Sequence, residues 1–429
     1  MNIDNNIVLS EKTEESSPIT VSIPDGADVI VGQHIYLVVT VKSPQVKSIK
    51  SISIEDPKKN ISVLEVVEDW KLINDTSGKA IFTLEIDDKL SSNTSISYTV
   101  HAYSDKNIDV EGIAPLNVGY MTKRMKKNSV ISLNTEIEVL DTLDAPSPID
   151  DPNSKYNVYS GVVTDENNNP LINTQVIISS VSRQKSLDLA NITTDPISSN
   201  TPELIEIQKR KSLPDFIAVN SDESGSIRFR VYSKQGFSGT IDFTTEILGI
   251  INPTYAESAY IVGSYESSTF HLQNPLILGI LPGGIVRKKS GVKEFKVGVP
   301  EYKNPRIDDA IIFLMKDENN KTIQFKPVHY VDDVQNIGGY SFHLSYEKIP
   351  FNKKMDFYYI ILDFAGNYSY SKKLNVIFED DSGAGTNPNN GGNTGNGNHC
   401  DNGLYNKVDV DSNYEDGKFS LKIKSITLI

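Results

Sequence analysis

NDTSGKAIFTL, at residues 74–84, is a polar turn that leads directly into alternating apolar residues. The same order returns as NSDESGSIRFRV at residues 220–231 and as NIGGYSFHL at residues 336–344. In each stretch a glycine is followed by phenylalanine at the fourth position and by an aliphatic residue at the sixth. Residues two apart lie on one face of a strand, so each of these glycine phrases predicts a turn and a core-facing strand. The glycines of the three phrases are Gly78, Gly225 and Gly338, which lie 147 (225 − 78) and 113 (338 − 225) residues apart. This spacing indicates one phrase per domain, not a short solenoid repeat.

The rest of the chain also favours strands. Short runs of β-branched and aromatic residues, such as HIYLVVTV (34–41), end at Gly, Pro, Asn or Asp, as is typical of sandwiches and barrels. A further strand is predicted after each glycine phrase, at 95–102, 240–247 and 356–364. The best candidate for a helix is PELIEIQKR at 202–210.

The composition limits the classes of partner. The net charge is −14, which argues against nucleic acid because phosphate backbones require clustered Lys and Arg. The single cysteine, Cys400, allows no intrachain disulfide. No N-terminal signal peptide is visible in MNIDNNIVLSEKTEESSP, and the longest apolar run (275–286) is too short for a membrane helix. We therefore expect no membrane span.

The middle of the chain carries a family resemblance. GVVTDENNNPLINTQV (161–176) reads as a strand, a tight turn and a second strand, and it is followed by SDESG (221–225) and GFSGTI (236–241). Together they resemble the bacterial immunoglobulin-like domains of invasin- and intimin-type adhesins, and the carboxypeptidase-regulatory-like β-sandwich. The resemblance covers about 157–248, and reaches the flanking units only through the glycine phrase, the strand pattern and the turn LDFAGNYS (362–369). It implies tandem, non-enzymatic adhesion domains.

The predicted fold is all-β, with three tandem immunoglobulin-like β-sandwiches, a flexible Gly/Asn linker and a C-terminal strand segment. Residues 181–215 form a polar insert where the family usually has a short connection. The predicted organisation is an N-terminal flexible segment (1–19), sandwich 1 (20–140), a linker (141–156), sandwich 2 (157–284), sandwich 3 (285–380), a Gly/Asn-rich linker (381–405) and a docking segment (406–429).

The C-terminus ends in KFSLKIKSITLI after the Gly/Asn-rich stretch. Two interpretations stay open for this tethered strand: an edge strand that packs back on its own chain, or a docking strand that adds to the sheet of a partner. The docking interpretation names an apolar set for partner binding, comprising Phe419, Leu421, Ile423, Ile426 and Leu428.

A search for chemistry finds no catalytic constellation. The six histidines fall singly, and the chain has no nucleophile elbow, phosphate-binding loop or dinucleotide fingerprint. Calcium is the one cofactor for which residues can be named, because it requires six to eight oxygen ligands and domain junctions can supply them. The candidate ligands are Asp141, Asp144, Asp150, Asp151, Glu379, Asp380 and Asp381, with solvated surface acids as the simpler interpretation.

We therefore predict a non-enzymatic structural or adhesive module from a bacterial surface, a secreted fibre or a phage-like particle. Its partners would be a protein or glycan on a cell surface, or further copies of the chain through the C-terminal strand. One alternative is a carbohydrate-binding accessory protein that uses Trp70, Tyr103 or Tyr120 as stacking platforms. A third interpretation is a toxin or enzyme whose active residues meet only in three dimensions.

Overall fold

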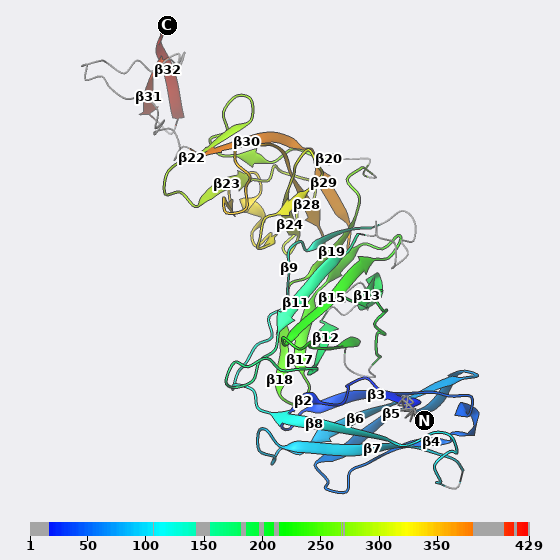
Figure 1. The fold of residues 1–429 in the computed structure, drawn as a ribbon. Coiled ribbons are helices and arrows are strands. Elements are labelled where there is room, and N and C mark those ends of the chain that lie inside the picture. Colours follow the sequence, from blue (N-terminus) through cyan, green and yellow to red (C-terminus); the bar gives the residue numbers. More distant parts are fainter. Residues whose placement is uncertain are drawn as a thin grey trace, which may run out of the picture. The chain divides into compact units, whose positions relative to one another are not determined.

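The computed structural model describes residues 17–105, 107–142, 155–181, 186–196, 201–209, 214–266, 268, 271–380, 407–415 and 418–427. The chain divides into two compact units, Met1–Asp381 and Ser382–Ile429. Strands are the dominant element (Figure 1). The larger unit holds three sandwiches, each with its own apolar core, which we number 1 to 3 along the chain.

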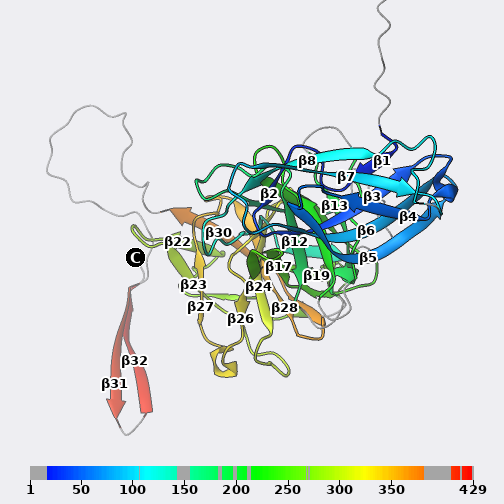
Figure 2. The ribbon, with the colours of Figure 1, turned by 90° about the horizontal axis from the view of Figure 1, so that it is seen from below.

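Sandwich 1 has two four-stranded sheets, with the orders β1-β3-β6-β5 and β2-β8-β7-β4. In Figure 2 the strands of the first sheet can be followed in this order, with β5 at the edge of the sheet. The inward residues of both sheets, among them Leu37, Phe82 and Val100, form one buried core. The strands are β1 Ile19–Val21, β2 Ala27–Ile30, β3 His34–Lys42, β4 Ser51–Glu55, β5 Ile61–Asn74, β6 Ser77–Ile86, β7 Ser95–Tyr103 and β8 Leu116–Lys123.

Sandwich 2 contains sheets of the orders β13-β15-β11-β9, β14-β12-β17-β18 and β10-β19-β16. Its core includes Tyr159, Phe229 and Phe243, whose rings are in mutual contact. The strands are β9 Asn134–Thr135, β10 Val139–Thr142, β11 Asn157–Val162, β12 Gln175–Ser180, β13 Ala190–Thr194, β14 Phe216–Asn220, β15 Ser226–Ser233, β16 Gly239–Ile241, β17 Phe243–Ile247, β18 Ile251–Tyr255 and β19 Ala259–Gly263.

Sandwich 3 packs the three-stranded sheet β21-β23-β27 against a larger sheet built on β24, β28 and β30. Aromatic residues such as Phe295, Phe313 and Phe357 dominate its core. The strands are β20 His271–Leu272, β21 Leu276–Ile277, β22 Ile285–Lys288, β23 Glu294–Gly298, β24 Ala310–Lys316, β25 Thr322–Gln324, β26 His329–Tyr330, β27 Phe342–Ser345, β28 Lys354–Leu362, β29 Tyr368–Ser371 and β30 Leu374–Asp380.

The strands opened by the glycine phrases are β6, β15 and β27, and they occupy equivalent places. Each pairs antiparallel with the strand that enters the core earlier in its sandwich: β3, β11 and β23. The phenylalanines Phe82, Phe229 and Phe342 are all buried. Each sandwich also has one parallel pair that joins an early short strand to its last strand: β2 with β8, β10 with β19, and β22 with β30. The all-β, tandem immunoglobulin-like prediction is therefore confirmed.

Gly225 illustrates why the phrase contains glycine. Its φ is +74°, and a Cβ there would lie 2.6 Å from the carbonyl oxygen of Val163. A side chain is thus excluded both by backbone conformation and by the neighbouring strand.

The helix predicted at 202–210 is wrong. Leu204 forms a bridge with Thr193, and Gln208 forms one with Phe216, so this stretch runs beside strands. Ile205 and Ile207, two residues apart, pack against the core of sandwich 2. Tertiary pairing overrides the weak local preference. Among the described residues the only helices are three short 3₁₀ turns, at Val46–Ser48, Ser186–Leu189 and Val334–Asn336.

The connections also differ from what the sequence suggested. Residues 141–156 were expected to link sandwiches 1 and 2, yet β10 and β11 at their two ends both pair within sandwich 2. Ile131 and Leu133 already belong to the core of sandwich 2. Likewise β20 and β21, expected in sandwich 2, pair with β29 and β23 of sandwich 3. Short strands of this kind carry too few residues for their partner to be read from periodicity.

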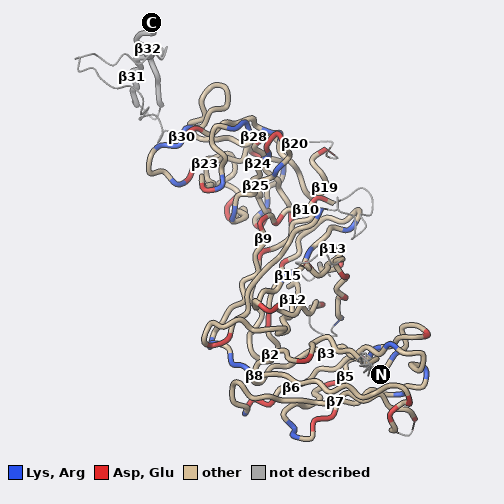
Figure 3. The backbone as a smooth tube through the Cα atoms, viewed as in Figure 1, with Lys and Arg blue, Asp and Glu red and all other residues tan. Residues whose placement is uncertain are grey.

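The smaller unit contains one antiparallel hairpin of β31 (Lys407–Glu415) and β32 (Lys418–Thr427). The Gly/Asn-rich segment that precedes it lies outside the described residues. In the described part of the chain no helix has the length and apolar character needed to cross a membrane. Lys and Arg are dispersed among Asp and Glu along the backbone (Figure 3).

Candidate functional site

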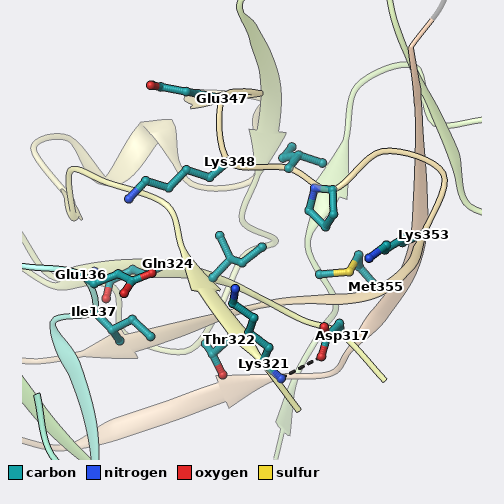
Figure 4. Close-up of a pocket in the computed structure, with 13 residues that line it drawn as sticks. Glu136, Ile137, Asp317, Lys321, Thr322, Gln324, Glu347, Lys348, Lys353 and Met355 are labelled. Carbon is teal, nitrogen blue, oxygen red and sulfur yellow. Dashed lines mark hydrogen bonds between the residues drawn. The ribbon is translucent and has the colours of Figure 1, made fainter. Parts of the chain in front are cut away.

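A hollow lies where sandwich 2 meets sandwich 3, and we call it the junction pocket. It has a volume of about 490 Å³. Glu136 and Ile137, which precede β10, form one wall, and Lys353 and Met355 lie on the opposite side (Figure 4). Asp317, which follows β24, residues 321–324, which include β25, and residues 347–350 complete the lining. The pocket therefore depends on contact between two domains.

The lining combines balanced charge with apolar surface. Three lysines (Lys321, Lys348 and Lys353) and three acids (Glu136, Asp317 and Glu347) surround the buried side chains of Ile349 and Met355. Asp317 is occupied in a turn, since its Oδ1 accepts the backbone N–H groups of Asn319 and Lys321 at 2.9 and 2.8 Å. The lining residues include no His, Cys or Ser. Their charged groups can contact a polar ligand.

A buried carboxyl group lies beneath the pocket. Glu138 is 6% exposed, and its Oε2 accepts a hydrogen bond from Nε2 of Gln324 at 2.8 Å. Gln324 in turn accepts the backbone N–H of Glu138 through Oε1 at 2.7 Å. Burial raises the pKa of Glu138 to about 7, with Lys326 opposing the shift and Glu257 adding to it. This reciprocal pair joins β25 of sandwich 3 to the chain entering β10 of sandwich 2.

Other contacts close the same junction. Lys326 Nζ pairs with Glu257 Oε2 at 2.5 Å and also donates to the carbonyl oxygen of Thr135. The hydroxyl groups of Tyr260 and Tyr330 are 2.6 Å apart. We call this junction, between sandwiches 2 and 3, the second junction. Its apolar part contains Tyr260, Val262, Ala310, Ile312, Leu314, Tyr358, Ile360, Leu362 and Tyr370.

A second hollow of about 660 Å³ adjoins the first and shares Ile137 and Thr322 with it. Four tyrosines line it, together with Asp141, Asn157 and Lys316: Tyr156, Tyr265, Tyr358 and Tyr370. We call it the tyrosine hollow. Tyr156 is 39% exposed and lies under the guanidinium of Arg230, whose Cζ is 4.5 Å from the ring centroid.

Amide, hydroxyl and carboxylate side chains close the first junction, between sandwiches 1 and 2. The Gln175 amide accepts the backbone N–H of Tyr36 and donates to its carbonyl oxygen, both at 2.8 Å. Thr174 Oγ1 donates to the carbonyl oxygen of Asp28 at 2.8 Å, and Asp28 Oδ2 accepts the N–H of Ile172 at 2.9 Å. The side chains of Gln175 and Thr174 thus form hydrogen bonds to backbone groups of sandwich 1, as a neighbouring strand would.

The apolar part of the first junction is a small cluster of Tyr36, Ile81, Ile177 and Phe216. The predicted insert at 181–215 contributes here as well as to its own sandwich. Within it β13 pairs with β15, Gln208 Oε1 accepts from Tyr36 Oη at 2.8 Å, and Glu206 pairs with Lys79 at 2.9 Å. Residues 182–185, 197–200 and 210–213 lie outside the described part. The described parts of the insert therefore contribute contacts to the first junction.

The predicted calcium ligands are only partly described. Asp141 pairs with Lys155 at 2.9 Å, and Glu379 pairs with Arg287 at 3.1 Å. Asp380 lies 3.8 Å from Lys288, and Asp144, Asp150, Asp151 and Asp381 are outside the described residues. Within the described residues no group of three or more His, Cys, Asp or Glu side chains could hold a metal ion. Calcium binding stays a prediction.

The residues predicted to dock a partner fall in the smaller unit. Phe419, Leu421, Ile423 and Ile426 lie in β32, and Leu428 is beyond the described residues. β32 pairs with β31 of its own chain. Partner binding by this strand also stays a prediction.

The three aromatic residues suggested as sugar platforms do not form one surface. Tyr120 is buried, and its hydroxyl is 2.7 Å from that of Tyr98. Trp70 packs over Gly78, where its ring leaves no room for a Cβ. Tyr103 donates to Glu55 at 2.8 Å on β4. The aromatic residues that do gather are in the tyrosine hollow, which a search for single platforms could not find.

The comparisons with known proteins identify no family. No family model and no curated protein matches the chain. Among solved structures, the immunoglobulin 1–2 module of the Drosophila receptor protein tyrosine phosphatase DLAR is 9% identical, with a TM-score of 0.21, and the match covers 51% of this chain and 98% of that one. The Bacillus cereus major pilin subunit BcpA is 9% identical, with a TM-score of 0.18 and coverages of 84% and 98%. Escherichia coli alpha-2-macroglobulin is 9% identical, with a TM-score of 0.19, and the match covers 92% of this chain but 32% of that one.

Proposed function

We propose that the chain is a non-enzymatic structural or adhesive module of a bacterial surface, a secreted fibre or a phage-like particle. The observation that carries this proposal is the pair of buried junctions between consecutive sandwiches. At each junction an amide side chain bonds to the backbone of the neighbouring domain, through Gln175 to Tyr36 and through Gln324 to Glu138. Domains joined in this way transmit force and hold binding loops in fixed register, as a spacer or adhesin must.

Loop contacts would supply the adhesive part. The turn between β28 and β29 is fixed by Asp363, whose two carboxylate oxygens accept from the backbone and side chain of Asn367, both at 2.9 Å. This turn displays Phe364, which is 92% exposed. A large aromatic side chain on a rigid turn is a typical anchor for a protein partner. Calcium, if the acidic junction residues bind it, would stiffen the array further.

Glycan-array binding combined with size-exclusion chromatography and light scattering tests the proposal. We expect ordered oligomers or fibres, or a protein partner lost on Phe364→Ala, and no discrete glycan. A monomer that binds one defined glycan with high selectivity would overturn the structural proposal.

The tyrosine hollow supports a second candidate function, carbohydrate binding. Its tyrosines combine ring faces with nearby amide and charged groups, a composition that suits sugars. If this function holds, Tyr156→Ala should abolish glycan binding, whereas Tyr255→Ala on the exposed end of β18 should leave it unchanged. Equal binding by both variants would contradict it.

A further inference from the structure

The long edge strand β5 exposes an unusual amount of apolar surface. It spans Ile61–Asn74 and is paired only with β6, so its other edge has no partner in the described structure (Figure 2). Six of its large apolar residues are between 39% and 57% exposed: Val63, Leu64, Val66, Val67, Leu72 and Ile73. An apolar strand with an unpaired edge adds to another sheet unless something covers it.

The pairing of β5 with β6 is interrupted. Its register shifts at four places, between Val63 and Glu65, Val66 and Glu68, Glu68 and Lys71, and Leu72 and Asn74. Such bulges increase the local twist and prevent a flat sheet from adding along the whole strand. They leave the apolar side chains exposed, however, so a short and independently moving strand is a better fit than the edge of a rigid domain.

The charge of β5 further restricts its partner. It carries Glu65, Glu68 and Asp69 against one lysine, Lys71. Glu68 is occupied by Lys71 and Lys79, at 3.4 and 3.8 Å. Glu65 and Asp69 form no ion pair with any other described residue. The exposed face is therefore apolar and acidic, which favours a strand that alternates apolar and basic residues.

The chain contains one such strand at its own C-terminus. β32 carries Lys418, Lys422 and Lys424 and no acid, interleaved with apolar residues, whereas β31 carries Asp409, Asp411 and Glu415. The basic edge of the hairpin is thus the β32 edge. A two-stranded hairpin is marginally stable alone and gains from a third strand. The 26 residues from Asp381 to Asn406 that precede it are rich in Gly and Asn.

The structure points to β5 as the acceptor for β32 of a second copy of this chain, which adds to its edge and covers Leu64 and Val66. This inference deepens the proposed structural function by naming its partner. Donor and acceptor are different surfaces, so the contact is head-to-tail, and every assembly keeps one free donor at one end and one free acceptor at the other. The expected product is an open chain of copies.

Two full-length double variants test the contact. The acceptor variant is Leu64→Lys with Val66→Lys, two exposed positions whose change leaves the core of sandwich 1 intact. The donor variant is Leu421→Lys with Ile423→Lys. In sedimentation velocity we expect the assemblies of the unchanged chain to become larger as its concentration rises. Each variant alone should associate at least about tenfold more weakly. The control is Ile307→Lys, at an exposed position in sandwich 3, which should assemble like the unchanged chain.

Mixing the two variants gives the decisive outcome. The acceptor variant still has an intact β32 and the donor variant an intact β5, so an equimolar mixture should form 1:1 dimers that grow no further. A charge exchange gives a second test, in which Glu65→Lys with Asp69→Lys weakens assembly with the unchanged chain. Combination with a chain carrying Lys422→Glu and Lys424→Glu should then restore it. Circular dichroism of each variant confirms that it is folded.

Three results would overturn the inference: an unchanged chain that stays monomeric at every concentration, assemblies that survive in both variants, or a mixture that forms no dimer. A monomer would mean that β32 covers β5 of its own chain or does not bind it. Assemblies that survive in both variants would still leave the structural function in place, because another contact would then build them. The glycan-binding monomer described above would instead remove the structural function itself.

Discussion

Both junctions between sandwiches are held by an amide side chain that bonds to the backbone of the neighbouring domain, but the groups around these bonds differ in charge. At the first, the reciprocal bond is made by an uncharged amide, because Gln175 bonds to both backbone polar groups of Tyr36. At the second, the equivalent reciprocal bond involves an ionisable group, Glu138, with the Lys326–Glu257 ion pair nearby. Neutral hydrogen bonds do not depend on pH, whereas a buried carboxyl group does. The Gln175 bonds of the first junction should therefore not respond to pH, whereas the Glu138–Gln324 bond of the second should.

Two backbone N–H groups report on the junctions separately. The N–H of Tyr36 donates to Gln175 at the first junction, and the N–H of Glu138 donates to Gln324 at the second. Native-state hydrogen exchange at these two positions measures the opening free energy of each junction in the full chain. Every prediction below uses one as the signal and the other as the control.

The largest effect is expected from Phe216→Ala. Phe216 is buried between the sandwiches, with its ring edge-to-face against Tyr36 at a centroid distance of 5.0 Å. Loss of the ring leaves a cavity and should lower the opening free energy of the first junction by about 3–5 kcal/mol. Exchange at Tyr36 should rise accordingly, with little change at Glu138. The half-exposed Phe237 provides a matched control, and a comparable loss in Phe237→Ala would show that the effect is not local.

Gln175→Ala should cost somewhat less, about 2–4 kcal/mol. The substitution removes two hydrogen bonds and leaves the N–H and C=O of Tyr36 without their partner. The loss should be the same at pH 5 and pH 8, since no proton is involved. A loss that varied with pH would contradict the distinction between the junctions.

Glu138→Gln should change the second junction in the opposite direction. The pKa of Glu138 is raised to about 7 by burial, so the folded state favours the protonated form. Its ordinary pKa is near 4.3, and the junction therefore loses stability as pH rises from there to about 7. Glutamine keeps the shape without the charge. At pH 8 it should stabilise the junction by on the order of 1–3 kcal/mol, with little effect at pH 4.

Exchange at the N–H of position 138 measures this difference, with Tyr36 as the control that should not respond. A variant that is destabilised at pH 8 would mean that the charged form is the one held in the folded state.

The smallest effect is expected from Lys79→Ala. Its pair with Glu206 links β6 to the insert, at 2.9 Å, but Glu206 is largely exposed. Exposed ion pairs contribute little, and we expect less than about 1 kcal/mol at the first junction. Added salt should remove what difference there is. A loss approaching that of Gln175→Ala would show that the insert is a main element of the junction.

Local patterns were enough to predict the strands opened by the glycine phrases and several of the longer strands. The alternation around Phe82, Phe229 and Phe342 depends only on neighbours two residues away, so it is readable without a structure. Very short strands were not predicted, because β9, with two residues, and β10, with four, are too short to show an alternating pattern. Residues 202–210 were mistaken for a helix for a related reason: Thr193, which forms a bridge with Leu204, belongs to another strand, β13.

The junctions could not be predicted at all. Gln175 and Gln324 look like ordinary polar residues at the ends of strands, and nothing near them in the chain indicates that each will meet another domain. The partners are distant in sequence, and a hydrogen bond between distant segments leaves no periodic trace. The tyrosine hollow is similar, since its rings come from three separate stretches of the chain.

The sequence by itself determined the fold class, the strand opened by each glycine phrase, and the basic, apolar character of β32, because these follow from residue type and a period of two. Only the tertiary structure decided which strands are edges, which polar residues are buried between domains, and that β5 exposes its apolar residues. Those properties depend on what lies across a sheet or a junction, and a linear pattern contains no information about neighbours contributed by a remote part of the chain.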